Sequence, residues 1–270
     1  MEALVQQIQQ LCSPSTQEIS VFCLGNFSVC IKEHSEEIQN WGRDKTLQLF
    51  QFLITHRHHR GLHKEKIIDR LWDDLDMEAG ERDFKVALHG IHKILEPERK
   101  RNADPHFVRR QGPVYRLHRE AIWLDVDVFE QLISEGNRLF SQEDTEAAIL
   151  YFQKAIELYR GDFLPDRLYE DWSSSERERL QLLALGAIIQ LAELLLDKNP
   201  LESIHLTQKA LLIDPVWEDA YRIQMKAYLR KGNRPLAIRT FQQCTKVLED
   251  EFGIEPLPET KKLFQEIKGF

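Results

Sequence analysis

Residues 81–97, ERDFKVALHGIHKILEP, predict an amphipathic helix from about Glu81 to Leu95, which Pro97 ends. Its apolar side chains recur every three or four residues and form one stripe, which consists of Phe84, Leu88, Ile91 and Leu95. The opposite face presents donors at about one per turn, namely Arg82, Lys85, His89 and Lys93. A helix of this kind fits the DNA major groove, which is about 12 Å wide. A solvated polar face is the alternative, and Glu81 and Asp83 favour it.

The residues before this helix predict a small sheet and two further helices. Strands are expected at Ile19–Leu24 and Phe27–Ile31, because both runs are rich in β-forming residues and Gly25-Asn26 suits the turn between them. A helical period then begins at Arg43 and runs to about His56. A second helix buries Ile67, Ile68, Leu71 and Trp72 and stops at the acidic segment from Asp73 to Gly80.

A basic hairpin is predicted after the helix. Residues Phe107–Arg110 and Val114–His118 flank Gln111-Gly112-Pro113, which is typical of a turn between two strands. Residues 99–119 hold seven Lys and Arg against one acid, Asp104. A sheet, three helices and a basic hairpin, in this order, are the plan of a winged helix-turn-helix DNA-binding domain. This order favours DNA over the solvated-face alternative.

Net charge is divided unevenly along the chain. The overall charge is −8, yet residues 1–124 hold 18 basic and 18 acidic side chains, and residues 125–270 hold 18 and 26. The acidic excess therefore lies in the second half, and the charge balance of the first half does not exclude a nucleic-acid partner.

A repeat of 34 residues dominates the second half of the chain. Ala237-Ile238-x-x-Phe241-x-x-Cys244 follows Ser203-Ile204-x-x-Thr207-x-x-Ala210 by this period, which is that of tetratricopeptide repeats. An earlier copy begins at Ala148, and the 55 residues between it and the next copy indicate an insertion of about 21 residues near Asp162–Leu182. We expect Gly136 to let two helices approach, and the aromatic residues Tyr159, Phe163 and Trp172 to fill the space between repeats.

The first half resembles the winged helix of the Streptomyces antibiotic regulatory protein type of activator. The matching landmarks are Leu24-Gly25-Asn26-Phe27, Lys64–Trp72, Phe84–Leu88 leading to Leu95-Glu96-Pro97, and Val108–Gly112 with Tyr115. Many members have a Ser-Arg pair where this chain has His89-Gly90, and a Ser or Thr helix cap where it has His63. The resemblance implies that the connection between the second and third helices contacts RNA polymerase, here through Asp74 and Asp76.

The second half resembles the bacterial transcriptional activation domain, which follows the winged helix in the same family. Its marks are Leu124–Phe129, Tyr159–Leu164, Glu170-Asp171-Trp172 followed by Glu176-Arg177, and Glu251–Thr260. The expected fold is therefore mainly α, with an N-terminal winged helix-turn-helix (α+β) followed by an all-α tetratricopeptide-like helical-repeat domain. The predicted boundaries are 1–18 for a tail or short helix, 19–122 for the winged helix and 123–270 for the activation domain.

Other chemistry has little support in the sequence. His56, His58, His59 and His63 have no nearby acidic cage or Cys pair, so we expect no metal site, and the acidic segment lacks a calcium-loop pattern. No phosphate-binding or nucleophile motif is present, so we expect neither a cofactor nor catalysis. The absence of a long apolar run and of a secretion signal favours a cytoplasmic protein without membrane contact.

The leading hypothesis is a sequence-specific transcriptional regulator, an activator that binds double-stranded promoter repeats and recruits RNA polymerase. The candidate DNA contacts are Arg43, Lys64, Arg82, Lys85, His89, Lys93, Arg109, Arg110 and Gln111. The helical repeats would provide a homodimer interface or a surface for a protein partner. The alternatives are a protein-interaction scaffold of tetratricopeptide type and the regulatory part of a larger signalling protein.

Overall fold

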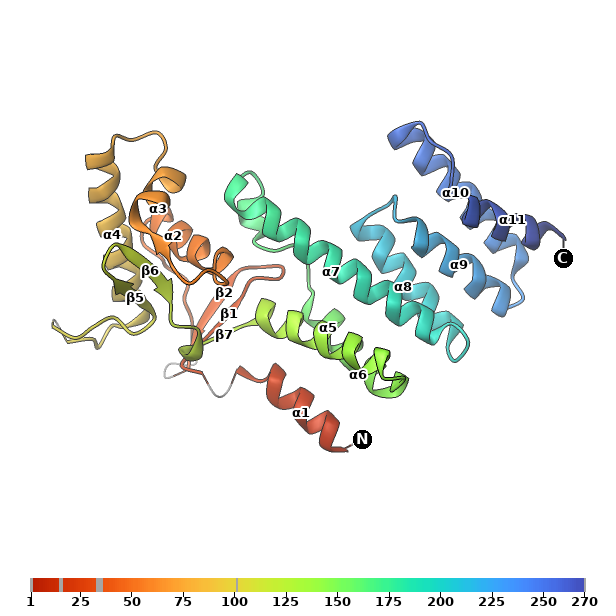
Figure 1. Cartoon of the computed structure of the whole chain (residues 1–270), viewed down its shortest axis with the longest axis horizontal. Coiled ribbons are helices and arrows are strands. Elements are labelled where there is room, and N and C mark those ends of the chain that lie inside the picture. Colours follow the sequence, from red (N-terminus) through yellow and green to blue (C-terminus); the bar gives the residue numbers. More distant parts are fainter. Residues whose placement is uncertain (1, 15–16, 33–35, 101, 270) are drawn as a thin grey trace. The chain divides into compact units, whose positions relative to one another are not determined.

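The computed structural model describes residues 2–14, 17–32, 36–100 and 102–269 (Figure 1). The chain forms two compact units. We call the first the winged-helix unit, which comprises Glu2–Val128 and Tyr159–Leu180. We call the second the repeat unit, which comprises Phe129–Leu158 and the chain from Gln181 onward. The predicted mainly α fold, with a small N-terminal sheet, is confirmed.

The winged-helix unit begins with helix α1 (Glu2–Cys12) and a four-stranded sheet of order β3-β2-β1-β7. The predicted pair is present as β1 (Ile19–Phe22) and β2 (Ser28–Ile31), which are antiparallel. Two further strands were not predicted: β3 (Glu36–Glu37) and β7 (Ile122–Leu124), of which β7 pairs parallel with β1. Strands this short lack enough residues to show an alternating pattern.

Three helices follow this sheet and precede the hairpin in the sequence, as predicted, and they pack against one another. They are α2 (Asp44–Thr55), α3 (Lys64–Leu71) and α4 (Met77–Leu95). The predicted start of the third helix near Glu81 was wrong, because the Oδ1 atom of Asp76 accepts a hydrogen bond from the Ala79 amide at 2.8 Å and caps the helix one turn earlier. A second sheet of order β4-β6-β5 follows, built from β4 (Leu62–His63), β5 (Val108–Gln111) and β6 (Val114–Leu117).

The inserted segment, with the short 3₁₀ helix η3 (Pro165–Arg167), belongs to the winged-helix unit. Phe163 is fully buried and forms an isolated β-bridge with Leu24, and Trp172 meets Phe52 edge to face with ring centroids 5.5 Å apart. The expectation that these aromatic side chains fill the space between repeats was therefore wrong. Their partners are residues of the N-terminal half, which lie more than 100 positions earlier in the sequence.

Asp125 is a buried carboxylate at the start of helix α5 (Asp125–Ser141). Its two oxygens accept hydrogen bonds from the backbone amides of Cys23 at 2.8 Å and Leu24 at 3.0 Å. Burial outweighs these bonds and raises the pKa of Asp125 to about 6. Burial also raises the pKa of the neighbouring Cys23 thiol well above its ordinary value, so this cysteine behaves as a small apolar side chain.

The repeat unit stacks α6 (Thr145–Leu158), the C-terminal part of α7 (Asp171–Leu195), α8 (Pro200–Ile213), α9 (Glu218–Arg230), α10 (Arg234–Phe252) and α11 (Pro258–Gly269). Helices α8 and α10 begin one 34-residue period apart, each after an asparagine whose side chain accepts a backbone hydrogen bond: Asn199 and Asn233. A Cβ atom on Gly136 would lie 2.8 Å from the Phe152 ring, so the predicted close approach of α5 and α6 is confirmed.

The string Glu251–Thr260 has a structural role in closing the last repeat. Oε1 of Glu218 accepts hydrogen bonds from the Leu257 amide at 2.7 Å and from the Thr260 hydroxyl. Ile267 of α11 is completely buried with Met225 and Ala237, and Phe264 stacks on Phe241. Helix α11 thus covers the apolar face that the final repeat would otherwise expose.

Gly90→Ala should destabilise the winged-helix unit by about 1–2 kcal/mol, because overpacking there outweighs the helix propensity of alanine. A Cβ atom at position 90 would lie 2.8 Å from Oγ1 and 2.9 Å from Cγ2 of Thr46 on α2. In a Thr46→Ala background both atoms are gone, so the same substitution should become neutral or stabilising. Urea unfolding of the four proteins tests this, and a stabilising Gly90→Ala in the parent chain would contradict it.

Asp125→Asn should flatten the pH dependence of stability between pH 4 and 7. The raised pKa means that the folded state holds this proton more tightly than the unfolded state does. The stabilisation is therefore complete below the unfolded pKa near 3.9 and is lost as pH rises through about 6, by about 3 kcal/mol in total. Urea unfolding at several pH values tests this, with the exposed Asp69→Asn as control. A parent-minus-variant difference that stays constant or grows with pH would reject it.

Candidate nucleic-acid interface

Helix α4 presents the predicted basic face to solvent. Phe84, Ala87 and Ile91 are buried, and Leu88 is half-buried. All four predicted donors on the other face are exposed: Arg82, Lys85, His89 and Lys93. Since their spacing follows the helical period, these side chains line one side of α4 for most of its length.

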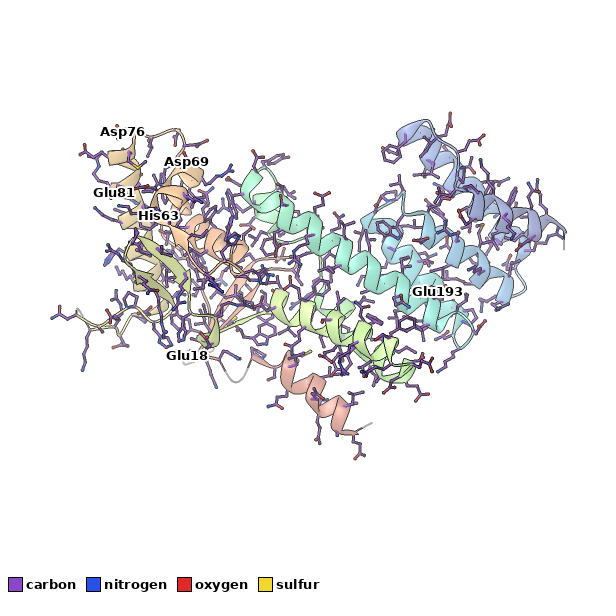
Figure 2. All side chains as sticks on the ribbon, in the orientation of Figure 1. Glu18, His63, Asp69, Asp76, Glu81 and Glu193 are labelled. Atoms are coloured by element: carbon purple, nitrogen blue, oxygen red, sulfur yellow. The ribbon has the colours of Figure 1, made fainter. Side chains whose placement is uncertain are left out.

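Glu81, which is labelled in Figure 2, lies close to two of the candidate cations at the N-terminal part of this helix. The Nζ atom of Lys64 donates a hydrogen bond to Oε1 of Glu81, and Nζ of Lys85 lies 3.7 Å from Oε2. The hydrogen bond from Lys64 holds the pKa of Glu81 below its usual range. From the sequence, Glu81 was interpreted only as a negative charge that weakens the basic patch. Its spacing of four residues from Lys85 nevertheless indicates an ion pair.

The hairpin is attached to the start of helix α3. Strand β4 pairs with β6, and the Lys64 amide donates a hydrogen bond to the Pro113 carbonyl at 2.8 Å. Arg110 is exposed, and its Nε atom donates to the Gly112 carbonyl at 2.7 Å across the turn. Gln111 is exposed beside it, opposite Val114. These contacts fix the direction in which the basic turn projects.

A groove of about 900 Å³ lies between helix α4 and the hairpin. Leu88 and His92 of α4 line one side, and Arg109, Arg110 and Tyr115 line the other. Burial lowers the pKa of His92, so this side chain favours its neutral form. The structure therefore brings Arg109 and Arg110 beside α4, whereas exposed Arg43 precedes α2 and does not line this groove.

The predicted polymerase-contacting residues lie in a short connection between α3 and α4. Asp74 is exposed, and Asp76 is both exposed and engaged as the cap of α4. Two apolar side chains in the same stretch are also exposed, Leu75 at 38% and Met77 at 56%.

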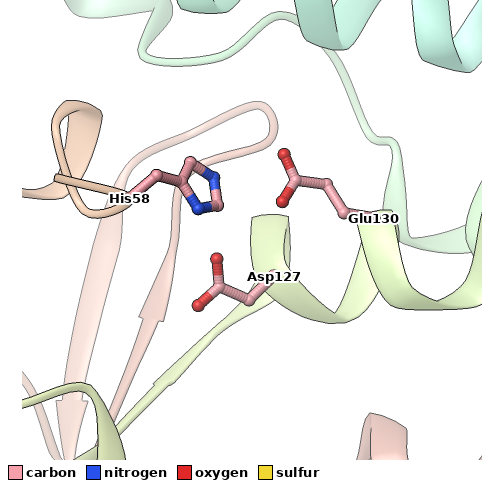
Figure 3. Close-up of side chains that lie close together, drawn as sticks. All are labelled: His58, Asp127 and Glu130. Atoms are coloured by element: carbon pink, nitrogen blue, oxygen red, sulfur yellow. The ribbon is translucent and has the colours of Figure 1, made fainter.

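The histidine-rich turn after α2 does not hold a free set of metal ligands. Figure 3 shows His58 directed toward Asp127, and the figure also includes Glu130, which belongs to the repeat unit. Both oxygens of Asp127 are already ion-paired, Oδ1 with Arg57 and Oδ2 with Arg119, each at 2.6 Å. Two guanidinium groups therefore already neutralise Asp127.

A family model for the bacterial transcriptional activator domain matches residues 124–268, which is more than half of the chain. The chain belongs to this family. The matched residues are those of the second half, whose sequence resembles this domain.

Two known proteins extend the comparison. The chain is 30% identical over 142 residues to the regulatory protein DnrI of Streptomyces peucetius, and it spans about half the length of that relative, 49%. It also resembles the structure of Mycobacterium tuberculosis EmbR in complex with a low-affinity phosphopeptide, with a TM-score of 0.79 and 18% identity. That match covers 94% of this chain and 65% of the other, and at this identity it shows the fold alone.

None of the described helices combines the length and the apolar composition needed to cross a membrane.

Proposed function

We propose that this chain acts in the cytoplasm as a transcriptional regulator. It would be a sequence-specific DNA-binding protein that recognises promoter repeats. The observation that carries the proposal is the exposed basic face of α4 beside the groove and the basic hairpin. Helix α4 would enter the major groove, and the turn between β5 and β6 would meet the adjacent backbone or minor groove.

The candidate residues have different roles according to whether they belong to the helix or to the hairpin. Arg82, Lys85 and His89 project from the helix itself and would reach base edges, where Arg and Lys donate to guanine. Arg109, Arg110 and Gln111 belong to the hairpin and would contact phosphates. Lys64 shares Glu81 with Lys85, so we assign Lys64 to the backbone and expect Glu81 to limit the net charge at this end of α4. Arg43 and Lys93 would add outer phosphate contacts.

Lys85→Ala should weaken binding to the specific site by about 1–3 kcal/mol and leave binding to unrelated duplexes nearly unchanged. Arg110→Ala should weaken binding to all duplexes alike and make the salt dependence shallower by about one phosphate contact. Fluorescence anisotropy at several salt concentrations measures both quantities.

The exposed Lys226→Ala variant in the repeat unit is the matched control, because it removes the same charge far from the hairpin in sequence. If Lys85→Ala and Arg110→Ala both bind DNA like the parent chain while keeping their fold, the assignment of the interface is wrong. If the parent chain itself does not bind duplex DNA at low salt, the hypothesis of a protein-interaction scaffold replaces that of a DNA-binding regulator.

We also propose that the connection between α3 and α4 contacts RNA polymerase through Asp74, supported by the neighbouring exposed Leu75 and Met77. An anionic segment would be repelled by DNA phosphates, so it is better placed on a surface that faces a protein partner. The helical repeats would add a second partner surface, for a second copy or another protein. Exposed apolar side chains such as Leu212 at 86% and Phe252 at 61% support this assignment.

Asp74→Asn should reduce activated transcription in a purified system several-fold while leaving DNA affinity unchanged, because it removes a charge from a contact with polymerase alone. Asp76→Asn provides a comparison that removes the same charge but keeps a capping acceptor on α4, whereas Asp76→Ala should cost about 1 kcal/mol of stability. Unchanged transcription by Asp74→Asn would show that the segment is only a solvated linker.

A further inference from the structure

A second basic cavity lies on the hairpin and shares Arg109 and Tyr115 with the α4 groove. Its volume is about 330 Å³, and it is lined by Leu53 of α2, residues 56–62 after α2, Arg109 of β5, and residues 115–120 of β6 and its continuation. The lining includes five arginines and four histidines, which are Arg57, Arg60, Arg109, Arg116, Arg119, His56, His58, His59 and His118. Glu120 is the one acid among the lining residues.

The cations at this cavity differ in how well they are neutralised. The Arg57 side chain is fully buried and ion-paired with Asp127 and Glu176, and Arg119 shares Asp127. The single lining acid, Glu120, lies 3.3 Å from His118. Within the described ranges, by contrast, Arg60, Arg109 and Arg116 form no ion pair. Positive charge at the mouth of the cavity is therefore left without a protein counterion.

The strand register of the hairpin places two of these positive charges next to each other. Arg109 and Arg116 are direct cross-strand partners in the β5–β6 pair, so both side chains project from the same face of the sheet. Like charges placed opposite each other in this way destabilise a hairpin. Burial and the nearby Arg109 both lower the pKa of His118, so the same excess of positive charge also acts on the imidazole. An anion bound in the cavity would relieve this repulsion.

We propose that this cavity binds a small phosphate-bearing molecule, with Arg60, Arg109 and Arg116 as the residues that hold its phosphate. Guanidinium groups donate paired, charge-assisted hydrogen bonds to phosphate oxygens, and three of them from two segments match a dianion. The cavity volume lies within the range of small-ligand sites. The histidines and Tyr115 of the lining would then meet the remainder of the ligand.

A small ligand fits this site better than a DNA backbone does. The cations converge on a hollow whose lining includes the buried Arg57, and phosphates of a duplex meet open surfaces more easily than a hollow of this size. The cavity is formed along the hairpin from Tyr115 toward Glu120, away from the Gly112 turn, and Arg109 is the one lining residue that the proposed function also places on DNA. The proposal does not depend on that function.

The test uses the full chain and inorganic phosphate as the probe. The thermal midpoint should rise saturably with phosphate when chloride is replaced at constant ionic strength, and the dependence yields a dissociation constant. Arg60→Gln and Arg116→Gln should each weaken phosphate binding about tenfold or more, as expected for the loss of a charge-assisted hydrogen bond. Both side chains are exposed, so the variants should fold, and circular dichroism verifies this.

Arg110→Gln is the matched control, because Arg110 is an exposed arginine on the same hairpin that does not line this cavity. It should bind phosphate like the parent chain and lose DNA affinity, whereas Arg60→Gln should show the reverse. A midpoint that does not rise saturably, or equal phosphate binding by Arg60→Gln, Arg116→Gln and the parent chain, would overturn the proposal. Equal loss of DNA affinity by Arg60→Gln and Arg110→Gln would also overturn it, and would assign the cavity to the DNA surface.

Discussion

The buried guanidinium of Arg57 constrains the winged-helix unit more than any other described group. Its side chain has no exposed surface, and it is held by Asp127 and Glu176 at 2.6 Å each. A buried charge without partners costs several kcal/mol, so all three residues have to converge whenever the unit folds. Because they come from the turn after α2, the start of α5 and the first half of α7, one ion-pair group joins both halves of the sequence.

Further polar contacts extend this constraint along helix α2. Gln48 donates to Glu170 at 2.7 Å, and Gln51 donates to Asp166 at 2.9 Å while it accepts from Arg167. Both glutamines are buried, although they stand on the polar side of an amphipathic pattern. The inserted segment therefore completes the surface of α2, and the compact units do not coincide with the predicted boundary between residues 122 and 123.

The sequence was sufficient to predict the structural elements that apolar periodicity or turn chemistry determines. The three helices, the hairpin and the 34-residue repeat follow from such local patterns, and the asparagine caps at 199 and 233 reinforce the repeat. Local patterns could not show that Phe163 and Trp172 pack on the N-terminal half, because their partners are distant in sequence. The same reason applies to the phosphate-sized cavity, whose cations come from a turn and a hairpin about 50 residues apart.

The distribution of charge along the sequence determines which segment would face DNA in the proposed interface. Residues 125–270 carry the whole acidic excess and would be repelled by a duplex, whereas residues 99–119 are strongly basic, so DNA would approach through the hairpin. Arg109 lines both the α4 groove and the smaller cavity. An anion that engaged Arg109 in the cavity would remove part of the charge available to DNA. By thermodynamic linkage DNA would then weaken the binding of that anion by the same factor, so the two sites are energetically coupled through one side chain.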